Sequence, residues 1–424
     1  MRGMATMEKL KIHGGRRLEG CLTVQGSKNS VLPILAATIL VRGESILRNC
    51  PELKDVDAAI SILRHLGCQV TREGKDIHVD STTIVRCDIP DELMREMRSS
   101  VIFLGAILGR VGEAELSMPG GCELGPRPID LHLNALRAMG AEVQAADGTM
   151  NCRAGRLHGA KIDLPIPSVG ATENAMLAAV AAVGETVIAN AAREPEIVDL
   201  QNFLLASGAK IRGAGQSTIT VIGGGMGCSV EHRIIPDRIV AATYLSAVAF
   251  AGGRLVLKDG MPAHVKAVTT ALQAAGCEIN VRDRDLELVS SGALRAISPV
   301  ITRPYPGFAT DAQPCLLAAA TKSAGTCVFI ENIFQNRYRY VEELRRMGAD
   351  IRLEGRVAVV TGVAHLTGAT VTATDLRGGA ALVVAALGAQ GETEIFELDH
   401  MDRGYDDFAG NLRQLGAEVM RIAQ

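Results

Sequence analysis

The chain has 424 residues, of which 47% are apolar and 21% are charged, and its formal net charge is −3. Hydrophobic cores divide beyond roughly 250–300 residues, so we expect two domains. The small negative charge provides no field that would hold nucleic acid or an anionic membrane surface. We therefore expect neither kind of partner.

The cysteines and the N-terminal segment indicate a reduced, cytoplasmic protein. None of the ten cysteines forms a Cys-x-x-Cys pair, which excludes a zinc ribbon. The first ten residues lack the apolar segment of a signal peptide. The longest apolar run, 175–183, is shorter than the roughly 20 residues that span a bilayer, so we expect no membrane insertion.

A short motif, Leu-x-x-x-Gly-(Ala/Cys)-x-(Ile/Val), occurs six times and divides the chain into repeats. Its glycines are 68 to 73 residues apart: Gly67, Gly140, Gly208, Gly276, Gly348 and Gly416. A second glycine precedes each copy by 23 to 28 residues and begins a strand-like run: Gly43, Gly112, Gly184, Gly253, Gly325 and Gly391. Two markers that keep the same spacing indicate a true repeat.

Each repeat predicts the same elements in the same order. An Ala/Leu-rich helix, apolar on nearly every side and therefore buried, comes first. The second glycine and its strand follow, and then a helix that the motif glycine closes in the left-handed conformation. The expected buried helices are 30–40, 100–110, 174–183, 239–251, 312–324 and 380–390. Six repeats of about 70 residues predict an α/β fold with three repeats in each domain.

Polar residues stand at the starts of these apolar helices. We attribute three of them to helix capping: Ser99, Thr172 and Asp237. Capping does not explain the cations Lys28, Arg98, Arg238 and Arg377, because the start of a helix repels a cation unless an anion lies beside it. Convergence of these helix starts would create a site for an anionic small molecule, although each cation alone could equally be solvated or ion-paired.

The segment 118–128 combines three glycines, three prolines, Cys122 and Arg127, a composition that suits a mobile lid over a ligand. The alternative is a long irregular surface connection. Nine other cysteines lie elsewhere, but Cys122 is flanked by glycines and followed by an arginine. We therefore interpret Cys122 as the reactive thiol.

Several strings together resemble the UDP-N-acetylglucosamine 1-carboxyvinyltransferases, an enolpyruvyl transferase family, from about Leu10 to Val419. They include GSKNSVLPILAA, LKDVD, PGGCELGPRPIDLH, NAAREPEIVDL, PGFATDAQ, ENIFQNR, ATDLR and MDRGYDD. The resemblance implies an inside-out α/β barrel of two domains, 28–235 and 1–27 with 236–424, and an active site in the cleft between them. It also implies transfer of the enolpyruvyl group of phosphoenolpyruvate to the 3′-hydroxyl of UDP-N-acetylglucosamine with release of phosphate, the first committed step of peptidoglycan synthesis.

The resemblance also implies roles for individual residues. Cys122 corresponds to the proton donor, which fosfomycin alkylates in sensitive members, and Asp311 to the general base, with Lys28 and Arg403 assisting. The phosphoenolpyruvate site would contain Lys28, Asn29, Arg127, Arg337, Arg377 and Arg403. The UDP-sugar site would contain Arg98, Arg127, Pro128, Ile129, Asp130, Leu131, Ser168, Val169, Gly170, Asp311 and Ile333. Some members carry Lys in place of Ile166 and Ser in place of Gly378 and Gly379.

These residue types suit an addition and elimination reaction. The enol methylene must gain a proton while the sugar hydroxyl loses one, so one acid and one base suffice. Arginines can stabilise the anionic intermediate and the departing phosphate, and we expect no cofactor, no metal and a monomer. The alternatives are a 3-phosphoshikimate 1-carboxyvinyltransferase-like enzyme and a catalytically silent paralogue that binds a sugar nucleotide.

Overall fold

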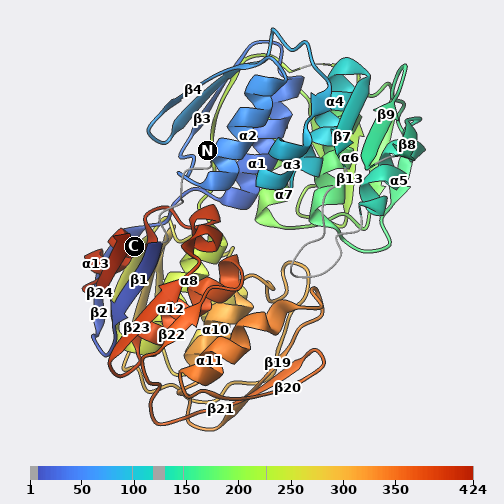
Figure 1. The fold of residues 1–424 in the computed structure, drawn as a ribbon. Coiled ribbons are helices and arrows are strands. Elements are labelled where there is room, and N and C mark those ends of the chain that lie inside the picture. Colours follow the sequence, from blue (N-terminus) through green and yellow to red (C-terminus); the bar gives the residue numbers. More distant parts are fainter. Residues whose placement is uncertain (1–7, 98, 118–128, 147, 226, 424) are drawn as a thin grey trace. The chain divides into compact units, whose positions relative to one another are not determined.

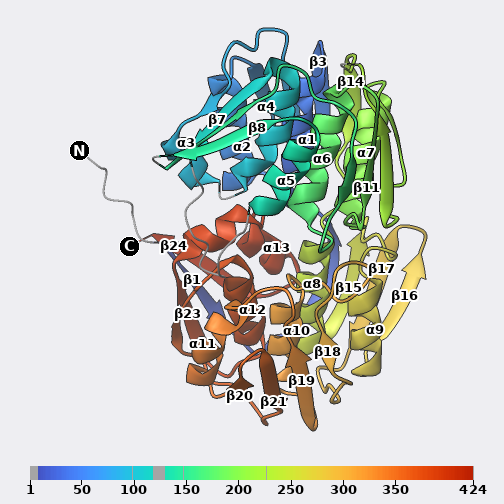
Figure 2. The ribbon, with the colours of Figure 1, turned by 90° about the vertical axis from the view of Figure 1, so that its right-hand side faces the viewer.

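The computed structural model describes residues 8–97, 99–117, 129–146, 148–225 and 227–423. They pack as two compact units. Residues 8–25 and 236–423 form unit 1, and the described residues between 26 and 235 form unit 2. Figures 1 and 2 show the ribbon of each unit from two directions.

Each unit is built around buried, Ala/Leu-rich helices. In unit 1 these are α8 (Arg238–Ala251), α10 (Gln313–Ala320) and α12 (Leu376–Leu387), which pack against one another. In unit 2 they are α1 (Lys28–Ala37), α4 (Leu104–Val111) and α6 (Val169–Ala181). Here α4 packs on α6, and the turn η1 (Thr38–Leu40) that follows α1 touches both. Because these helices are apolar on nearly all sides, they are stable only in the interior of a unit.

Shorter or more polar helices complete each unit. The described part of unit 2 also contains α2 (Lys54–His65), α3 (Asp91–Glu96), η2 (Ser100–Phe103), α5 (Asp130–Ala138) and α7 (Pro195–Ala206). That of unit 1 also contains α9 (Lys266–Ala274), η3 (Arg337–Tyr340), α11 (Val341–Arg346), η4 (Leu398–Arg403) and α13 (Phe408–Gln414). No helix in the described ranges is long and apolar enough to cross a membrane.

The strands form four-stranded sheets that repeat one pattern. Within its described residues, unit 2 has the orders β14 (Val230–Arg233), β3 (Glu44–Arg48), β5 (Asp76–Asp80), β4 (Gln69–Glu73); β6 (Asp88–Ile89), β7 (Glu113–Ser117), β9 (Thr149–Arg153), β8 (Glu142–Ala146); and β10 (Lys161–Asp163), β11 (Glu185–Ala189), β13 (Thr218–Ile222), β12 (Lys210–Arg212). The described part of unit 1 has the orders β2 (Leu18–Thr23), β15 (Gly253–Lys258), β17 (Asp285–Ser290), β16 (Glu278–Arg282); β18 (Val300–Ile301), β19 (Thr326–Ile330), β21 (Val357–Thr361), β20 (Asp350–Glu354); and β22 (Thr370–Thr372), β23 (Glu392–Phe396), β1 (Glu8–His13), β24 (Glu418–Ala423). In every sheet the first two strands are parallel and the other pairings are antiparallel.

Two strands that are distant in sequence complete the first and the last repeat. Strand β14 pairs in parallel with β3, with Glu231 opposite Ile46. Strand β1 lies between β23 and β24, with Ile12 opposite Thr393 on one side and Val419 on the other. Figure 1 shows the blue strand β1 among the red strands of the C-terminal segment.

The repeat predicted from the glycines is confirmed. All six motif glycines have left-handed backbones, with φ between 89° and 104°, and each follows a helix and precedes a strand. Asp237 caps α8 as predicted, because its carboxylate accepts hydrogen bonds from the N–H groups of Ile239 and Val240. The α/β fold of six repeats thus follows from the sequence pattern.

The predicted start of α6 was wrong. The helix begins at Val169, five residues before the expected segment, and Ser168 rather than Thr172 is its cap. The Thr172 hydroxyl instead donates to the Ser168 carbonyl at 2.8 Å and accepts from the Ala192 N–H at 3.0 Å. An apolar helix that is buried on all sides has no amphipathic period that marks its first turn, which explains the error.

Candidate active site

In unit 1, the predicted site residues are grouped around Asp311, which lies just before α10. Its carboxylate is paired with two arginines that are almost completely buried, Arg337 at 1% and Arg377 at 3% exposure. The Arg337 Nη2 atom donates to Oδ1, and the Arg377 Nε atom donates to Oδ2 at 3.3 Å. A buried guanidinium group is costly without an anionic partner, and the carboxylate of Asp311 is such a partner for both arginines.

A second hydrogen-bonded chain fixes Arg337. Its Nε atom donates to the Thr310 hydroxyl at 3.1 Å, and that hydroxyl donates to the carboxylate of the buried Glu331 at 3.0 Å. Glu331 also accepts from the Ile333 N–H at 2.7 Å. These hydrogen bonds therefore connect Arg337 with the backbone of Ile333, a residue predicted to contact the UDP-sugar.

Arg403 lies at the end of η4, a segment that packs on α12, the helix that carries Arg377. Packing around α12 also bears on Gly378 and Gly379, the positions at which the resemblance gives serine in some family members. A Cβ atom added to Gly379 would lie 2.8 Å from the Cγ atom of Met401, and one added to Gly378 would lie 2.8 Å from the Cβ atom of Tyr340. Serine at either position would thus require the surrounding side chains to move.

In unit 2, the predicted residue Lys28 is the first residue of α1. Its ammonium group lies 2.5 Å from the carboxylate of Asp55, near the start of α2. The Asp55 side chain is 2% exposed and that of Lys28 is 12% exposed. Asn29 follows in the first turn of α1 and is half-buried. The anion expected beside Lys28 is therefore a carboxylate of the protein itself.

Two stretches predicted to contact the UDP-sugar meet in unit 2. Ile129, Asp130 and Leu131 stand at the start of α5, and Ser168, Val169 and Gly170 at the start of α6. The two helices pack together, and the Nδ1 atom of His132 lies 2.7 Å from the Nδ2 atom of Asn174.

The position of His132 also requires a glycine at residue 170. A Cβ atom on Gly170 would lie 2.9 Å from the Cε1 atom of His132. Asn174 Nδ2 is a donor, so His132 Nδ1 accepts and its proton is on Nε2. Burial lowers the pKa of His132 to about 4, which keeps the ring neutral near pH 7.

Four predicted residues, Arg98, Cys122, Arg127 and Pro128, lie outside the described residues. Ile166, which replaces a lysine of some family members, is described and is 57% exposed. It precedes the cap of α6, and its carbonyl accepts from the Ser168 N–H at 2.7 Å. An exposed apolar side chain at this place gives no ionic contact to an anionic ligand.

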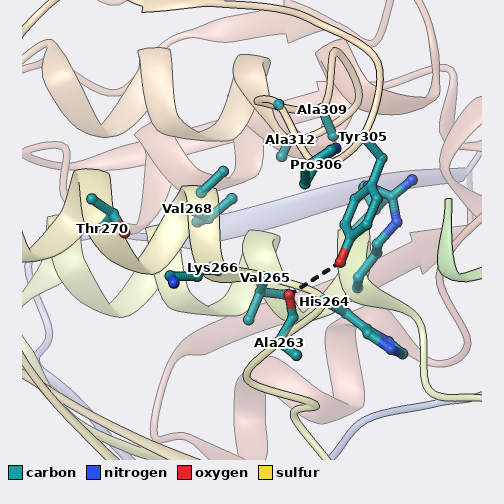
Figure 3. Close-up of a pocket in the computed structure, with 14 residues that line it drawn as sticks. Ala263, His264, Val265, Lys266, Val268, Thr270, Tyr305, Pro306, Ala309 and Ala312 are labelled. Carbon is teal, nitrogen blue, oxygen red and sulfur yellow. Dashed lines mark hydrogen bonds between the residues drawn. The ribbon is translucent and has the colours of Figure 1, made fainter. Parts of the chain in front are cut away.

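A pocket of about 330 Å³ in unit 1 is lined by Arg238, one of the predicted helix-start cations, and by Ala309 and Ala312, between which Asp311 lies in sequence (Figure 3). Its lining includes Arg238, His264, Lys266 and Tyr305, and the Tyr305 hydroxyl donates to the Ala263 carbonyl at 3.3 Å. Lys266 and His264 point to opposite sides, so they do not converge on one anion. Within the described residues, no group of three or more His, Cys, Asp or Glu side chains could hold a metal ion.

The sequence interpretation missed several residues that hold the predicted ones in place. Asp55 pairs with Lys28, Glu331 supports Arg337, and His132 fixes Gly170. All three stood inside strings already noted: Asp55 in LKDVD, His132 in PGGCELGPRPIDLH and Glu331 in ENIFQNR. The partners of Asp55 and His132 lie in other segments, and Glu331 reaches Arg337 through Thr310, so the strings alone do not reveal these contacts.

Comparison with known proteins identifies the family. A family profile described as EPSP synthase (3-phosphoshikimate 1-carboxyvinyltransferase) matches residues 12–412. A protein of Caldanaerobacter subterraneus subsp. tengcongensis named UDP-N-acetylglucosamine 1-carboxyvinyltransferase 2 is 50% identical over 98% of this chain and 100% of its own length. Another, of Carboxydothermus hydrogenoformans, named UDP-N-acetylglucosamine 1-carboxyvinyltransferase 1, is 46% identical over 98% of this chain and 99% of its own.

Solved structures agree with this fold. The enolpyruvyl transferase NikO from Streptomyces tendae has a TM-score of 0.87 at 26% identity and covers 99% of this chain and 100% of its own. An EPSP synthase from Acinetobacter baumannii has a TM-score of 0.76 at 19% identity, over 98% of this chain and 100% of its own, and shows the fold alone. With two relatives near half identity over nearly the full length, this chain belongs to the UDP-N-acetylglucosamine 1-carboxyvinyltransferase family, within the enolpyruvyl transferases.

Proposed function

We propose that this protein transfers the enolpyruvyl group of phosphoenolpyruvate to the 3′-hydroxyl of UDP-N-acetylglucosamine and releases phosphate, the first committed step of peptidoglycan synthesis. The observation that carries the proposal is the pairing of Asp311 with the buried guanidinium groups of Arg337 and Arg377. It brings a candidate base and two anion-binding groups together within one unit.

In the proposed cycle, the phosphate and carboxylate groups of phosphoenolpyruvate take the place of the Asp311 carboxylate beside the two arginines. Asp311 is then available to accept the proton of the sugar 3′-hydroxyl as its oxygen attacks C2 of the enol. Cys122 protonates the methylene carbon. The tetrahedral intermediate next loses phosphate and one methyl proton, which restores the enol double bond, and the arginines stabilise the negative charge.

Further parts of the proposal concern the remaining predicted residues and the cellular context. Lys28, Asn29, Arg127 and Arg403 complete the phosphoenolpyruvate site, and the starts of α5 and α6 bind the UDP-sugar. The arrangement at α6 supports this, because the first turn of a helix presents backbone N–H groups to an anion. We also propose that the protein acts as a monomer in the cytoplasm, which the free thiols of the nine described cysteines suit.

A comparison of acceptors tests the function. Phosphate release from phosphoenolpyruvate should require UDP-N-acetylglucosamine and should not occur with shikimate 3-phosphate. Release with shikimate 3-phosphate alone would assign the other carboxyvinyltransferase activity, which the names of the relatives do not favour. Release with neither acceptor, while UDP-N-acetylglucosamine still binds in calorimetry, would identify a silent sugar-nucleotide-binding protein.

A further inference from the structure

Tyr405 joins Arg377 to the interior of unit 1. The Nη1 atom of Arg377 donates to the Tyr405 hydroxyl oxygen at 3.2 Å, and the guanidinium carbon lies 5.6 Å from the centre of the tyrosine ring. Tyr405 is 4% exposed and its ring stacks on Phe408, with ring centres 4.4 Å apart. Stacking and burial hold the ring in one position, so its hydroxyl is a fixed partner for Arg377.

Tyr405 also contacts Thr243, and the geometry determines which group donates in each hydrogen bond. The Thr243 hydroxyl lies 3.0 Å from the carbonyl oxygen of Ile239, which can only accept, so Thr243 gives its single proton there. The Tyr405 hydroxyl lies 2.9 Å from the Thr243 oxygen and must therefore donate to it. The tyrosine oxygen then has its lone pairs available for Arg377.

Charge and burial preserve these donor and acceptor roles of Tyr405 and Arg377. Burial raises the pKa of Tyr405, so the phenol stays neutral and keeps its proton for Thr243. Burial alone would lower the pKa of Arg377, but Tyr405, Asp311 and Asp237 together more than offset it and hold that pKa above its ordinary value. Arg377 is therefore a permanent cation with one donor committed to Tyr405.

We propose that Tyr405 is a positioning residue that keeps Arg377 in place for phosphoenolpyruvate when Asp311 turns to the sugar hydroxyl, an inference that rests on the proposed function. A guanidinium group has five N–H groups, so one bond to Tyr405 leaves others for anionic oxygens. Among the residues that the structure describes, Asp311 is the side-chain acceptor that Arg377 keeps when the tyrosine hydroxyl is removed. When Asp311 turns to the sugar hydroxyl, Arg377 would then have neither of these two hydrogen-bond partners to hold its position.

Tyr405→Phe tests the inference, because it keeps the ring and its stacking and removes only the hydroxyl. Tyr244→Phe is the matched control: Tyr244 is also buried and packs edge-on against Phe408 at 5.8 Å. A second variant, Thr243→Val, keeps the side-chain shape and removes the acceptor of the tyrosine proton. KM for each substrate, kcat and the thermal unfolding midpoint are measured for the wild type and the three variants.

We expect Tyr405→Phe to raise KM for phosphoenolpyruvate about tenfold with little change in KM for UDP-N-acetylglucosamine, since a hydrogen bond to a charged group contributes on this scale. Thr243→Val should also raise KM for phosphoenolpyruvate. Tyr244→Phe should leave the KM values for both substrates near those of the wild type. An unchanged KM for phosphoenolpyruvate in Tyr405→Phe, or equal changes for both substrates, would contradict the positioning role. A wild type without acceptor-dependent phosphate release would instead overturn the proposed function.

Discussion

The ammonium group of Lys28 lies 2.5 Å from the carboxylate of Asp55, and both side chains are largely buried. Lys28 begins α1, where the helix dipole disfavours a cation, so its charge is stable only beside an anion. Asp55 supplies that anion. An anionic substrate that binds at Lys28 must therefore share the ammonium group with Asp55 or displace it.

Asp55→Asn should destabilise the protein, because it leaves a buried ammonium group beside a helix start without its counter-ion. We expect the free energy of unfolding in urea to fall by about 3 kcal/mol. Glu392→Gln is the control: Glu392 forms an exposed ion pair with Lys11 at 2.9 Å, and its loss should lower the free energy of unfolding far less. Inorganic phosphate should restore more stability to Asp55→Asn than to the wild type. An equal decrease in the free energy of unfolding of the two variants would show that Asp55 does not stabilise the charge of Lys28.

Asp311→Asn should lower kcat by about 10²- to 10⁴-fold while KM for UDP-N-acetylglucosamine changes little, because an amide cannot accept the hydroxyl proton. Asp259→Asn is a matched control in the same unit. Asp259 is 28% exposed and Asp311 29%, and each is paired with arginine. Steady-state kinetics of the purified variants measure the effect. A kcat for Asp311→Asn within twofold of the wild type would remove Asp311 from the role of base.

The stability of unit 2 should depend on pH through His132. Burial lowers its pKa from 6.5 to about 4, so between these values the unfolded chain binds a proton that the folded protein does not. The stabilisation is complete above pH 6.5 and is lost as the pH falls towards 4, by roughly 3 kcal/mol.

Urea unfolding at a series of pH values between 6.5 and 4.5 measures this contribution. His132→Asn should give a shallower decrease in the free energy of unfolding than the wild type. His365→Asn, which changes an exposed histidine, should keep the wild-type slope. Parallel curves for the wild type and His132→Asn would show that His132 does not cause the dependence.

Fosfomycin should label one cysteine of the native protein, Cys122. Among the described cysteines Cys228 is exposed, but its Sγ atom lies 3.3 Å from the Ser207 carbonyl, a partner that does not activate a thiolate. Mass spectrometry of the digested protein should find the adduct on the Cys122 peptide. Cys122→Ala should abolish labelling and Cys228→Ala should preserve it. An adduct on Cys228 would mean that exposure alone controls the reaction.

The repeated part of the fold was predictable because it depends on local chemistry. The left-handed conformation that ends a helix favours glycine at one position, as at Gly67 and Gly276, so the helix end can be found directly in the sequence. The start of α6 was not predictable, since Ser168 and Thr172 are both good caps and a helix buried on all sides has no polar face. Tertiary packing decided between them.

The sequence proposed the chemical groups of the candidate site but not the contacts between them. The family resemblance implied site roles for Lys28, Asp311, Arg337 and Arg377, and these roles stay predictions. The contact of Arg377 with Tyr405, by contrast, joins helix α12 to a segment 28 residues further along the chain. Such a contact depends on how α12 packs against η4, which no local pattern encodes. The partners that tune the charges of the site therefore required the structure.

Analysis of the reaction product tests the proposed chemistry most directly. Purified protein is incubated with phosphoenolpyruvate and UDP-N-acetylglucosamine, phosphate is quantified, and the sugar nucleotide is examined by mass spectrometry and proton NMR. We expect one phosphate for each product molecule, together with an enolpyruvyl ether at the 3′-oxygen of the sugar. Phosphate without that ether, or an enolpyruvyl group on a different oxygen, would contradict transfer to the 3′-hydroxyl.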